Sequence, residues 1–169
     1  MFLGKDIMGN PIIAISNGQS IGNVKDVYLS ADCRSVAGIY LGSEGLFSRK
    51  YFLIKSEDMV TIGRDAVLVT HSEVIHKVDD LQDSEEAWLR RDELQGRPVD
   101  TPGGTKVGKV GDIILDKEGK VLGFDLSPVY VAGPIAANGS IALHTVEDVG
   151  SEDGVMTIDL EQAEQQKLL

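Results

Sequence analysis

The stretch Ile21-Gly22-Asn23-Val24-Lys25-Asp26-Val27-Tyr28-Leu29 decides the fold, because it recurs as Val107-Gly108-Lys109-Val110-Gly111-Asp112-Ile113-Ile114-Leu115. In both copies the apolar positions depart from strict alternation, at Val24 and at Val110, which indicates a bulge or a sharp bend in the strand. Bent strands with a glycine close by are typical of small closed or nearly closed sheets. The sequence therefore predicts two copies of one small β unit.

Further short runs with β character surround each copy of this stretch and are separated by turn residues. They lie at residues 11–15, 36–41, 51–54, 59–62 and 66–70 in the first unit, and at 121–126, 141–144, 146–149 and 155–160 in the second. The positions that match between the units are Gly22, Asp26 and Gly38 in the first and Gly108, Asp112 and Gly123 in the second. We expect residues 1–10 to enter the first unit as a short turn or strand.

The repeat predicts a mainly β fold of two tandem small β-barrels joined by a short helix. The expected segments are a first domain at 1–71, an acidic linker at 72–95, a second domain at 96–160 and a polar tail at 161–169, whose short helix would be marginal alone. Asp83-Ser84-Glu85-Glu86 is typical of a helix start, and Gly96 of a stop, which predicts a helix from about Ser84 to Gln95. We expect Trp88 to pack against a barrel. Each unit is small, so an extensive contact between the halves is also expected.

Charge and composition argue against several classes of function for this chain, namely nucleic-acid binding, lipid adsorption and membrane spanning. The net charge of −11 arises after residue 71, because residues 1–71 carry equal numbers of basic and acidic side chains. Clustered basic side chains are few, so direct nucleic-acid binding and adsorption to anionic lipid are not expected. No leader pattern and no transmembrane segment is predicted, because no apolar run approaches about 20 residues. One cysteine, Cys33, fits a reducing, cytoplasmic setting.

The repeat resembles a known family. Its elements are a glycine turn, then Gly-x-Val-x-Asp-Val/Ile-x-Leu, a charged turn, and a strand of the form Val-x-Gly-Phe/Ile-x-Leu, and the second copy adds the entry Gly96-Arg97-Pro98-Val99. This pattern resembles the PRC-barrel family over about residues 3–71 and 94–160. That module is shared by the H subunit of photosynthetic reaction centres and the ribosome-maturation factor RimM. The resemblance implies an assembly and protein-binding domain, photosynthetic or ribosomal by resemblance only, with no general set of catalytic residues.

Asp26 and Asp112 are the clearest candidates for paired carboxylates. Two carboxylates in different environments can divide acid and base work. At equivalent points of two separate barrels, however, they need not approach each other. An aspartate beside a bend also accepts hydrogen bonds from backbone N–H groups that the bulge frees. We favour this structural interpretation, and we expect no catalytic residue.

The histidines, the cysteine and the glycine-rich turn lack the spacing that a metal site, a nucleophilic site or a phosphate loop requires. The three histidines, His71, His76 and His144, form no metal-binding pattern, and Cys33 has no sequence-adjacent base. Gly103-Gly104-Thr105-Lys106 is too short for a phosphate loop and predicts a hairpin turn. No metal and no cofactor is therefore expected. The acidic residues of the linker indicate either a solvated spacer or a docking segment for a basic partner, namely Asp79, Asp80, Asp83, Glu85 and Glu86.

Two apolar segments follow the Val-x-Gly strands and differ between the copies. They hold Leu46 and Phe47 in the first unit, and Val129, Tyr130, Val131 and Ile135 in the second. Exposed on loops of a rigid barrel, these side chains would anchor an interface, whereas in strands they would pack inside. The leading hypothesis is a non-enzymatic protein-binding or assembly module with an unknown protein partner. The alternatives are a small-ligand binder or enzyme that uses a cleft between the barrels, and a self-associating structural protein that forms homo-oligomers.

Overall fold

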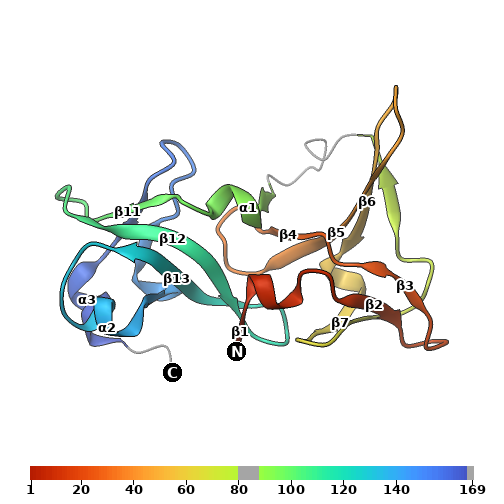
Figure 1. Cartoon of the computed structure of the whole chain (residues 1–169), viewed down its shortest axis with the longest axis horizontal. Helices are drawn as coiled ribbons and strands as arrows, with labels where there is room; N and C mark the ends of the chain where they lie inside the picture. The colour runs from red at the N-terminus through yellow and green to blue at the C-terminus, as the bar shows by residue number, and fades with distance from the viewer. Residues whose placement is uncertain (80–87, 167–169) are drawn as a thin grey trace.

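The structure is a computed structural model that describes residues 1–79 and 88–166, and it is mainly β, as predicted. Figure 1 shows two halves side by side. The first half has a sheet of order β3-β2-β8-β7, formed by β2 (Pro11–Ala14), β3 (Ser20–Asn23), β7 (Met59–Ile62) and β8 (Val67–Val69). Its other sheet has the order β10-β4-β5-β6-β9, formed by β4 (Asp26–Leu29), β5 (Val36–Glu44), β6 (Lys50–Lys55), β9 (His76–Val78) and β10 (Leu89–Arg90).

The second half is one sheet of order β14-β13-β12-β11-β16-β15, curved into a half-barrel, and β1 (Phe2–Leu3) also pairs with β12. Its strands are β11 (Pro98–Asp100), β12 (Lys106–Leu115), β13 (Val121–Val129), β14 (Ser140–Ala142), β15 (Val146–Asp148) and β16 (Met156–Ile158). The helices of this half are α2 (Pro134–Asn138) and α3 (Leu160–Gln165). Short 3-10 turns are η1 (Gly4–Ile7), η2 (Ser56–Asp58) and η3 (Leu143–Thr145). Within the described residues, no helix is long and apolar enough to cross a bilayer.

The predicted bend is present in both copies. In the second half, the pairing of β12 with β13 shifts register on both sides of Val110. In the first half the same bend divides the repeated stretch into β3 and β4, with Val24 between them. Both valines are about 1% exposed, because the bend turns them inward to the core. The repeat also conserves topology, since β2 runs parallel to β8 and β11 runs parallel to β16.

The predicted linker helix is present only in part among the described residues. Helix α1 covers only Arg91–Leu94, and Leu89 and Arg90 are extended as β10, which pairs with β4. The predicted helix is therefore wrong at these two residues, because the edge of β4 offers backbone partners that outweigh a weak helical preference. Its first part, residues 84–87, lies outside the described residues. The ring of Trp88 packs on the first half, 5.9 Å from that of Tyr28.

Each half gives its first strand to the sheet of the other half. Phe2 pairs with Leu115, and Leu89 pairs with Leu29 at the equivalent position of the repeat. The expectation that the first residues enter the first unit is thus wrong for β1, which joins the second sheet. A strand of two residues has little stability alone, and the unpaired edge of β12 supplies the partner it needs.

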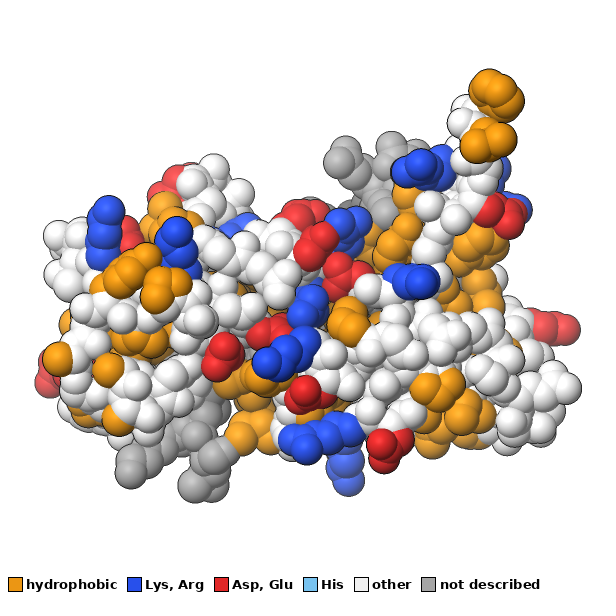
Figure 2. All heavy atoms as spheres, viewed as in Figure 1, with side chains coloured by type: hydrophobic (Ala, Val, Ile, Leu, Met, Phe, Trp, Pro, Cys, Tyr) orange, Lys and Arg blue, Asp and Glu red, His pale blue; other side chains and the backbone are white. Residues whose placement is uncertain are grey.

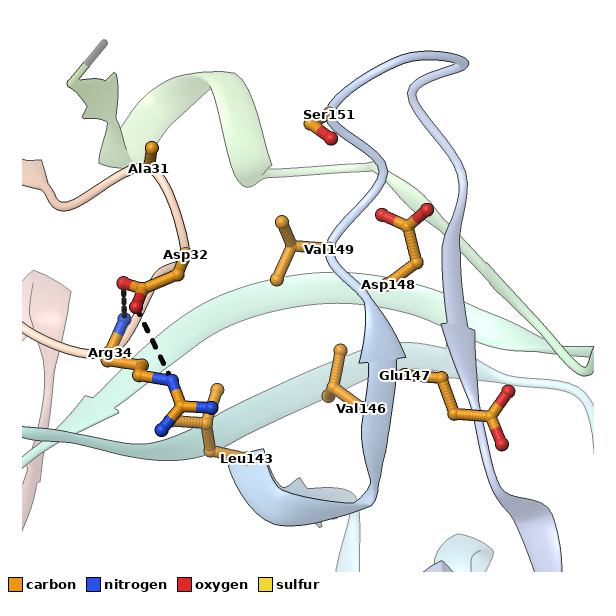
Figure 3. A pocket seen from close by; sticks show the side chains of 9 residues that line it. All are labelled: Ala31, Asp32, Arg34, Leu143, Val146, Glu147, Asp148, Val149 and Ser151. Carbon is orange, nitrogen blue, oxygen red and sulfur yellow. Dashed lines mark hydrogen bonds and ion pairs between the residues drawn. The ribbon is translucent and has the colours of Figure 1, made fainter. Parts of the chain in front are cut away.

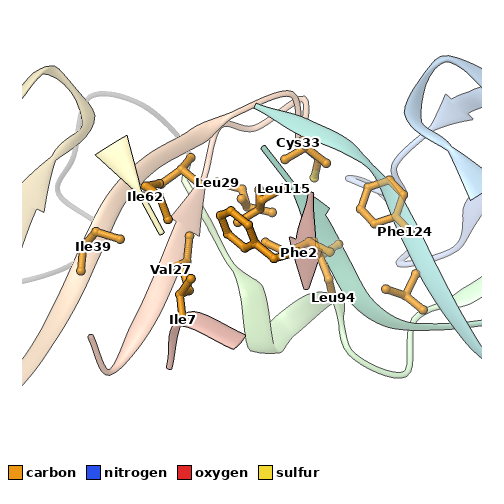
Figure 4. Packing of buried hydrophobic residues seen from close by; sticks show 14 of the residues in the cluster. Phe2, Ile7, Val27, Leu29, Cys33, Ile39, Ile62, Leu94, Leu115 and Phe124 are labelled. Carbon is orange, nitrogen blue, oxygen red and sulfur yellow. The ribbon is translucent and has the colours of Figure 1, made fainter. Parts of the chain in front are cut away.

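The two halves share one core. The buried apolar side chains form a single cluster that includes Ile12 and Ile39 of the first half and Val99 and Phe124 of the second. Figure 4 shows Phe2 between the halves, among side chains from both of them. The expected contact between the halves is therefore extensive, because it is continuous with the interior of each.

Helix α3 lies in the polar tail, where the sequence predicts a short helix. The Asp159 carboxylate accepts the Gln162 N–H at 3.0 Å and caps the helix, which begins at Leu160. Ala163 is about 2% exposed, and this contact with the core stabilises a helix that would be marginal in isolation.

Candidate interaction sites

The two aspartates of the repeat converge on Arg91, at the point where the halves meet. Arg91 Nε donates to Asp112 Oδ1 at 2.9 Å, and Arg91 Nη1 lies 3.8 Å from Asp26 Oδ1. The side chains of all three residues are at most 10% exposed. The expectation that the aspartates need not approach each other is therefore wrong, because one buried arginine lies between them.

Both carboxylates are also hydrogen-bonded to the backbone. Asp26 accepts the Val27 N–H, and Asp112 accepts the Ile113 N–H, each at 2.8 Å. Asp112 accepts the Lys5 N–H as well, at 2.8 Å. Burial raises the pKa of Asp26, since desolvation outweighs its backbone hydrogen bond and the two nearby arginines. These contacts occupy the carboxylate oxygens and correspond to the structural interpretation of the sequence.

Gly4 faces Arg91 across the meeting point of the halves. When the two copies are aligned from Pro11 and Pro98 backwards, Gly4 corresponds to Arg91. A Cβ atom at Gly4 would lie 2.5 Å from Arg91 Nε and 2.7 Å from Asp112 Oδ1. A side chain at both equivalent positions would force Arg91 or Asp112 to shift, because both positions face the same space. Sequence reasoning missed Arg91, and the one signal for it is that this alignment places an arginine opposite a glycine.

The hairpin tip, residues 45–49, is the most exposed apolar part of the described chain. Leu46 is 97% exposed and Phe47 is fully exposed. Figure 1 shows the β5–β6 hairpin extending beyond the rest of the molecule, and Figure 2 shows apolar side chains at its end. Gly45 permits the tight turn, because its φ is +102° and a Cβ there would lie 2.3 Å from the Ser48 carbonyl oxygen. Leu46 and Phe47 are therefore outside the core.

Basic side chains adjoin these two apolar residues. Arg49 and Lys50 follow after Ser48, and Lys50 forms an ion pair with Asp79. Lys77 of β9 pairs with Glu44 at the base of the tip. Among the described residues Arg49 has no ion pair, so the tip combines an apolar surface with an available positive charge.

The corresponding segment of the second half folds inward. Ile135 is 1% exposed, so it is not an exposed anchor. Pro134 begins α2, and this helix turns Ile135 toward the core. Val129 and Val131 are half-buried against the same core, whereas Tyr130 remains 53% exposed. Of the residues predicted as interaction anchors, only Leu46, Phe47 and Tyr130 are exposed.

A pocket of about 440 Å³ lies between the halves, and we call it the seam pocket. The loop at residues 30–35 forms one wall, and β15 with the residues on either side of it forms the other (Figure 3). Leu143, Val146 and Val149 give it an apolar lining. At its rim Asp32 lies 3.4 Å from Arg34, and the Ser30 hydroxyl lowers the pKa of Asp32 by donating a hydrogen bond. Asp148 lines the same pocket and accepts the Gly150 N–H at 2.7 Å.

The remaining candidates have structural settings. Cys33 is buried, and burial raises the pKa of its thiol to about 11, which keeps it protonated and unsuited to nucleophilic attack. His71 and His144 are exposed, and His76 lies 3.9 Å from Asp58. In the part of the chain that the structure describes, no group of three or more potential ligands could hold a metal ion.

The glycine-rich turn and one of the acidic linker residues, Asp79, also have structural settings. Thr101 N–H donates to the Thr105 carbonyl at 2.9 Å, which closes a turn between β11 and β12, as predicted for residues 103–106. Asp79 pairs with Lys50, and the other four acidic linker residues lie outside the described part: Asp80, Asp83, Glu85 and Glu86.

Three of the repeat glycines, Gly22, Gly38 and Gly108, lie where backbone atoms or large side chains approach closely. A Cβ at Gly108 would lie 2.5 Å from the Pro128 carbonyl oxygen, and one at Gly38 would lie 3.0 Å from the Trp88 ring. Glycine at these positions therefore allows close packing between strands and of side chains against the face of the sheet.

Comparison with known proteins agrees with the repeat. The family model of the PRC-barrel domain matches the chain twice, over residues 1–75 and over residues 89–164. Each match includes one copy of the repeated stretch and the short strand that crosses to the other half. No curated protein matches the chain.

Proposed function

Because the chain belongs to the PRC-barrel domain family, in two consecutive copies, we propose that it is a non-enzymatic protein-binding module that takes part in assembling a larger complex. The observation that carries this proposal is the hairpin tip, where Leu46 and Phe47 are almost wholly exposed. Folded domains seldom leave a large aromatic and a large aliphatic side chain together at a protruding end without a binding role. A cytoplasmic location fits the single buried cysteine.

The geometry of the tip suits an anchor. Aromatic side chains contribute much of the binding energy at protein interfaces, where they enter pockets and exclude water. The tip is joined to the core by paired strands, with Tyr40 opposite Leu53 and Ser43 opposite Tyr51, so its position is held by the sheet. Arg49 adds a charge that favours a partner with acidic residues beside an apolar pocket.

The buried aspartates support a non-enzymatic role. A catalytic acid or base must reach a substrate, whereas Asp26 and Asp112 are buried and contact Arg91 and backbone N–H groups. Their arrangement instead connects the two halves into one rigid support for the tip.

The proposal is tested by a Leu46→Ser/Phe47→Ser double variant. We expect its thermal unfolding to match the wild type, because neither side chain packs in the core, and we expect it to lose partners that the wild type captures from lysate of the source organism. Val60→Ser is the matched control, since Val60 is an apolar residue of the same half that is 50% exposed. If the double variant captures the same partners in the same amounts, the tip is not the binding site.

A further inference from the structure

Equivalent loops of the two halves pair across the seam. The first is residues 30–35, between β4 and β5, and the second is residues 116–120, between β12 and β13. Val36 N–H donates to the Gly119 carbonyl at 2.7 Å, and Val121 N–H donates to the Arg34 carbonyl at 2.9 Å. These two bonds are counterparts, so the centre of the seam follows the symmetry of the repeat.

One side of the seam is closed by further hydrogen bonds. Ile62, at the end of β7, donates its N–H to the Lys117 carbonyl at 2.9 Å. The Thr61 hydroxyl donates to the same carbonyl at 3.1 Å. The strand of the first half is thereby joined to the loop of the second half.

The other side of the seam is open. Val149 is the counterpart of Ile62, because β7 and β15 each follow a 3-10 turn. Ala31 is the counterpart of Lys117, because each is the second residue of the loop that follows the repeated strand. Within the described residues, Val149 N–H and the Ala31 carbonyl make no backbone hydrogen bond to each other, and both residues line the seam pocket. The loop at 30–35 is one residue longer than that at 116–120, so the two sides of the seam are not equivalent.

The open seam has the properties of a receptor for an apolar and basic segment. Val146 and Val149 point into it in Figure 3. Three acidic residues line the pocket, Asp32, Glu147 and Asp148, against one arginine, so its charge is negative. Its volume is within the range of about 300 to 1,000 Å³ that is typical of binding pockets.

We propose that the hairpin tip of one chain inserts into the seam pocket of a second copy of this chain. The tip presents Leu46 and Phe47 to the apolar lining, while Arg49 approaches the acidic rim. The tip therefore matches the pocket in polarity and in charge. Both surfaces belong to this chain, so the proposed partner is a second copy of it. The inference rests on the proposed function, because it names the partner of the tip.

The contact would join two different surfaces, so it is heterologous. In Figure 1 the β5–β6 hairpin extends away from β13, α2 and α3 of the second half, and the tip is not placed to enter its own pocket. A heterologous contact leaves a free tip at one end and a free pocket at the other, and it builds rings or open chains. Self-association should therefore extend beyond a dimer as concentration rises.

Sedimentation velocity of the full chain, from micromolar to millimolar concentration, tests the proposal. We expect the mean mass to rise with concentration, and the rise to be lost in both Phe47→Ser and Asp148→Lys while Val60→Ser retains it. Arg49→Glu should also weaken association, and combining it with Asp148→Lys should restore association by reversing both charges. Circular dichroism melting identifies any variant that is unfolded, and Glu147→Lys then serves as the second change at the rim.

Three results would overturn the inference. The first is a wild-type chain that stays monomeric throughout, and the second is association that persists in Asp148→Lys and Glu147→Lys. The third is binding to phosphatidylglycerol vesicles that requires Phe47 and is unaffected by the pocket variants, which would make the tip a lipid anchor. A monomeric chain whose tip variant still loses its lysate partners would refute this inference while leaving the proposed function in place.

Discussion

The two halves have the same strands but use equivalent positions differently. Where the first copy has Gly4, the second has Arg91, and this one side chain contacts both repeat aspartates. The segment after the Val-x-Gly strand extends into solvent in the first half, whereas in the second it folds over the core through α2. The difference shows that two copies of one unit can share a core and still differ where they meet, because a side chain at Gly4 would compete with Arg91 for the same space.

The largest expected effect comes from removing the arginine that breaks the symmetry. Arg91→Ala leaves Asp26 and Asp112 buried without their shared cation, and breaking a buried ion pair in this way typically costs about 3 to 5 kcal/mol. We expect a loss of that size in the free energy of unfolding, measured by urea denaturation.

Arg90→Ala is the matched control for this prediction. Arg90 is adjacent and chemically identical, and its Nε also lies 3.5 Å from Asp26 Oδ2. Its side chain, however, is 36% exposed, its nearer partner is the similarly exposed Asp92, and it makes no ion pair with Asp112 among the described residues. A partly exposed pair contributes about 1 kcal/mol or less. Equal losses in the two variants would show that Arg91 has no special place between the halves.

The next largest effect concerns Gly4, which faces Arg91 where the two halves meet. Gly4→Ala places a Cβ within 2.5 Å of Arg91 Nε, and such overpacking typically costs about 1 to 3 kcal/mol. The loss should shrink in the Arg91→Ala background, because the competing side chain is then absent, and urea denaturation of all four proteins completes the cycle.

Gly103→Ala is the control for a glycine with space around it. The nearest atom to a Cβ at Gly103 is the Thr101 hydroxyl oxygen at 3.9 Å, so little change is expected. A Gly4→Ala cost that is the same with and without Arg91 would contradict steric competition between the equivalent positions.

The features that the sequence predicted well are local or repeated. Alternation and turn residues locate most strands, and the two breaks in alternation correctly predict the bends at Val24 and Val110. The exchange of β1 and β10 was missed, because strands of two residues carry almost no periodic signal and are stabilised by an edge far along the chain.

The sites were predicted less completely than the fold. Leu46 and Phe47 were identified as an apolar loop pair, but their exposure depends on the length of the hairpin, which local composition does not report. The seam pocket depends on two loops of unequal length meeting two different strands. That arrangement is tertiary, and no single segment of sequence encodes it.

The smallest expected effect concerns the residues opposite the repeat aspartates. Asp26 pairs across the strands with Tyr40, whereas Asp112 pairs with Asp125. Burial, and then repulsion from Asp112, raises the pKa of Asp125. Because the folded-state pKa lies above the unfolded value, the folded protein binds the proton more tightly, and stability falls as pH rises through the interval between the two values.

Asp125→Asn should therefore be slightly more stable than the wild type at neutral pH. Like charges directly opposite each other on paired strands are unfavourable by amounts up to about 1 kcal/mol, and the nearby Lys5 reduces the gain. The gain should disappear below the ordinary pKa of aspartate, where the wild-type carboxyl is protonated in both states. Urea denaturation at a series of pH values measures this, with Asp65→Asn as the exposed control. A variant that is less stable than the wild type at neutral pH would contradict a net repulsion between Asp112 and Asp125.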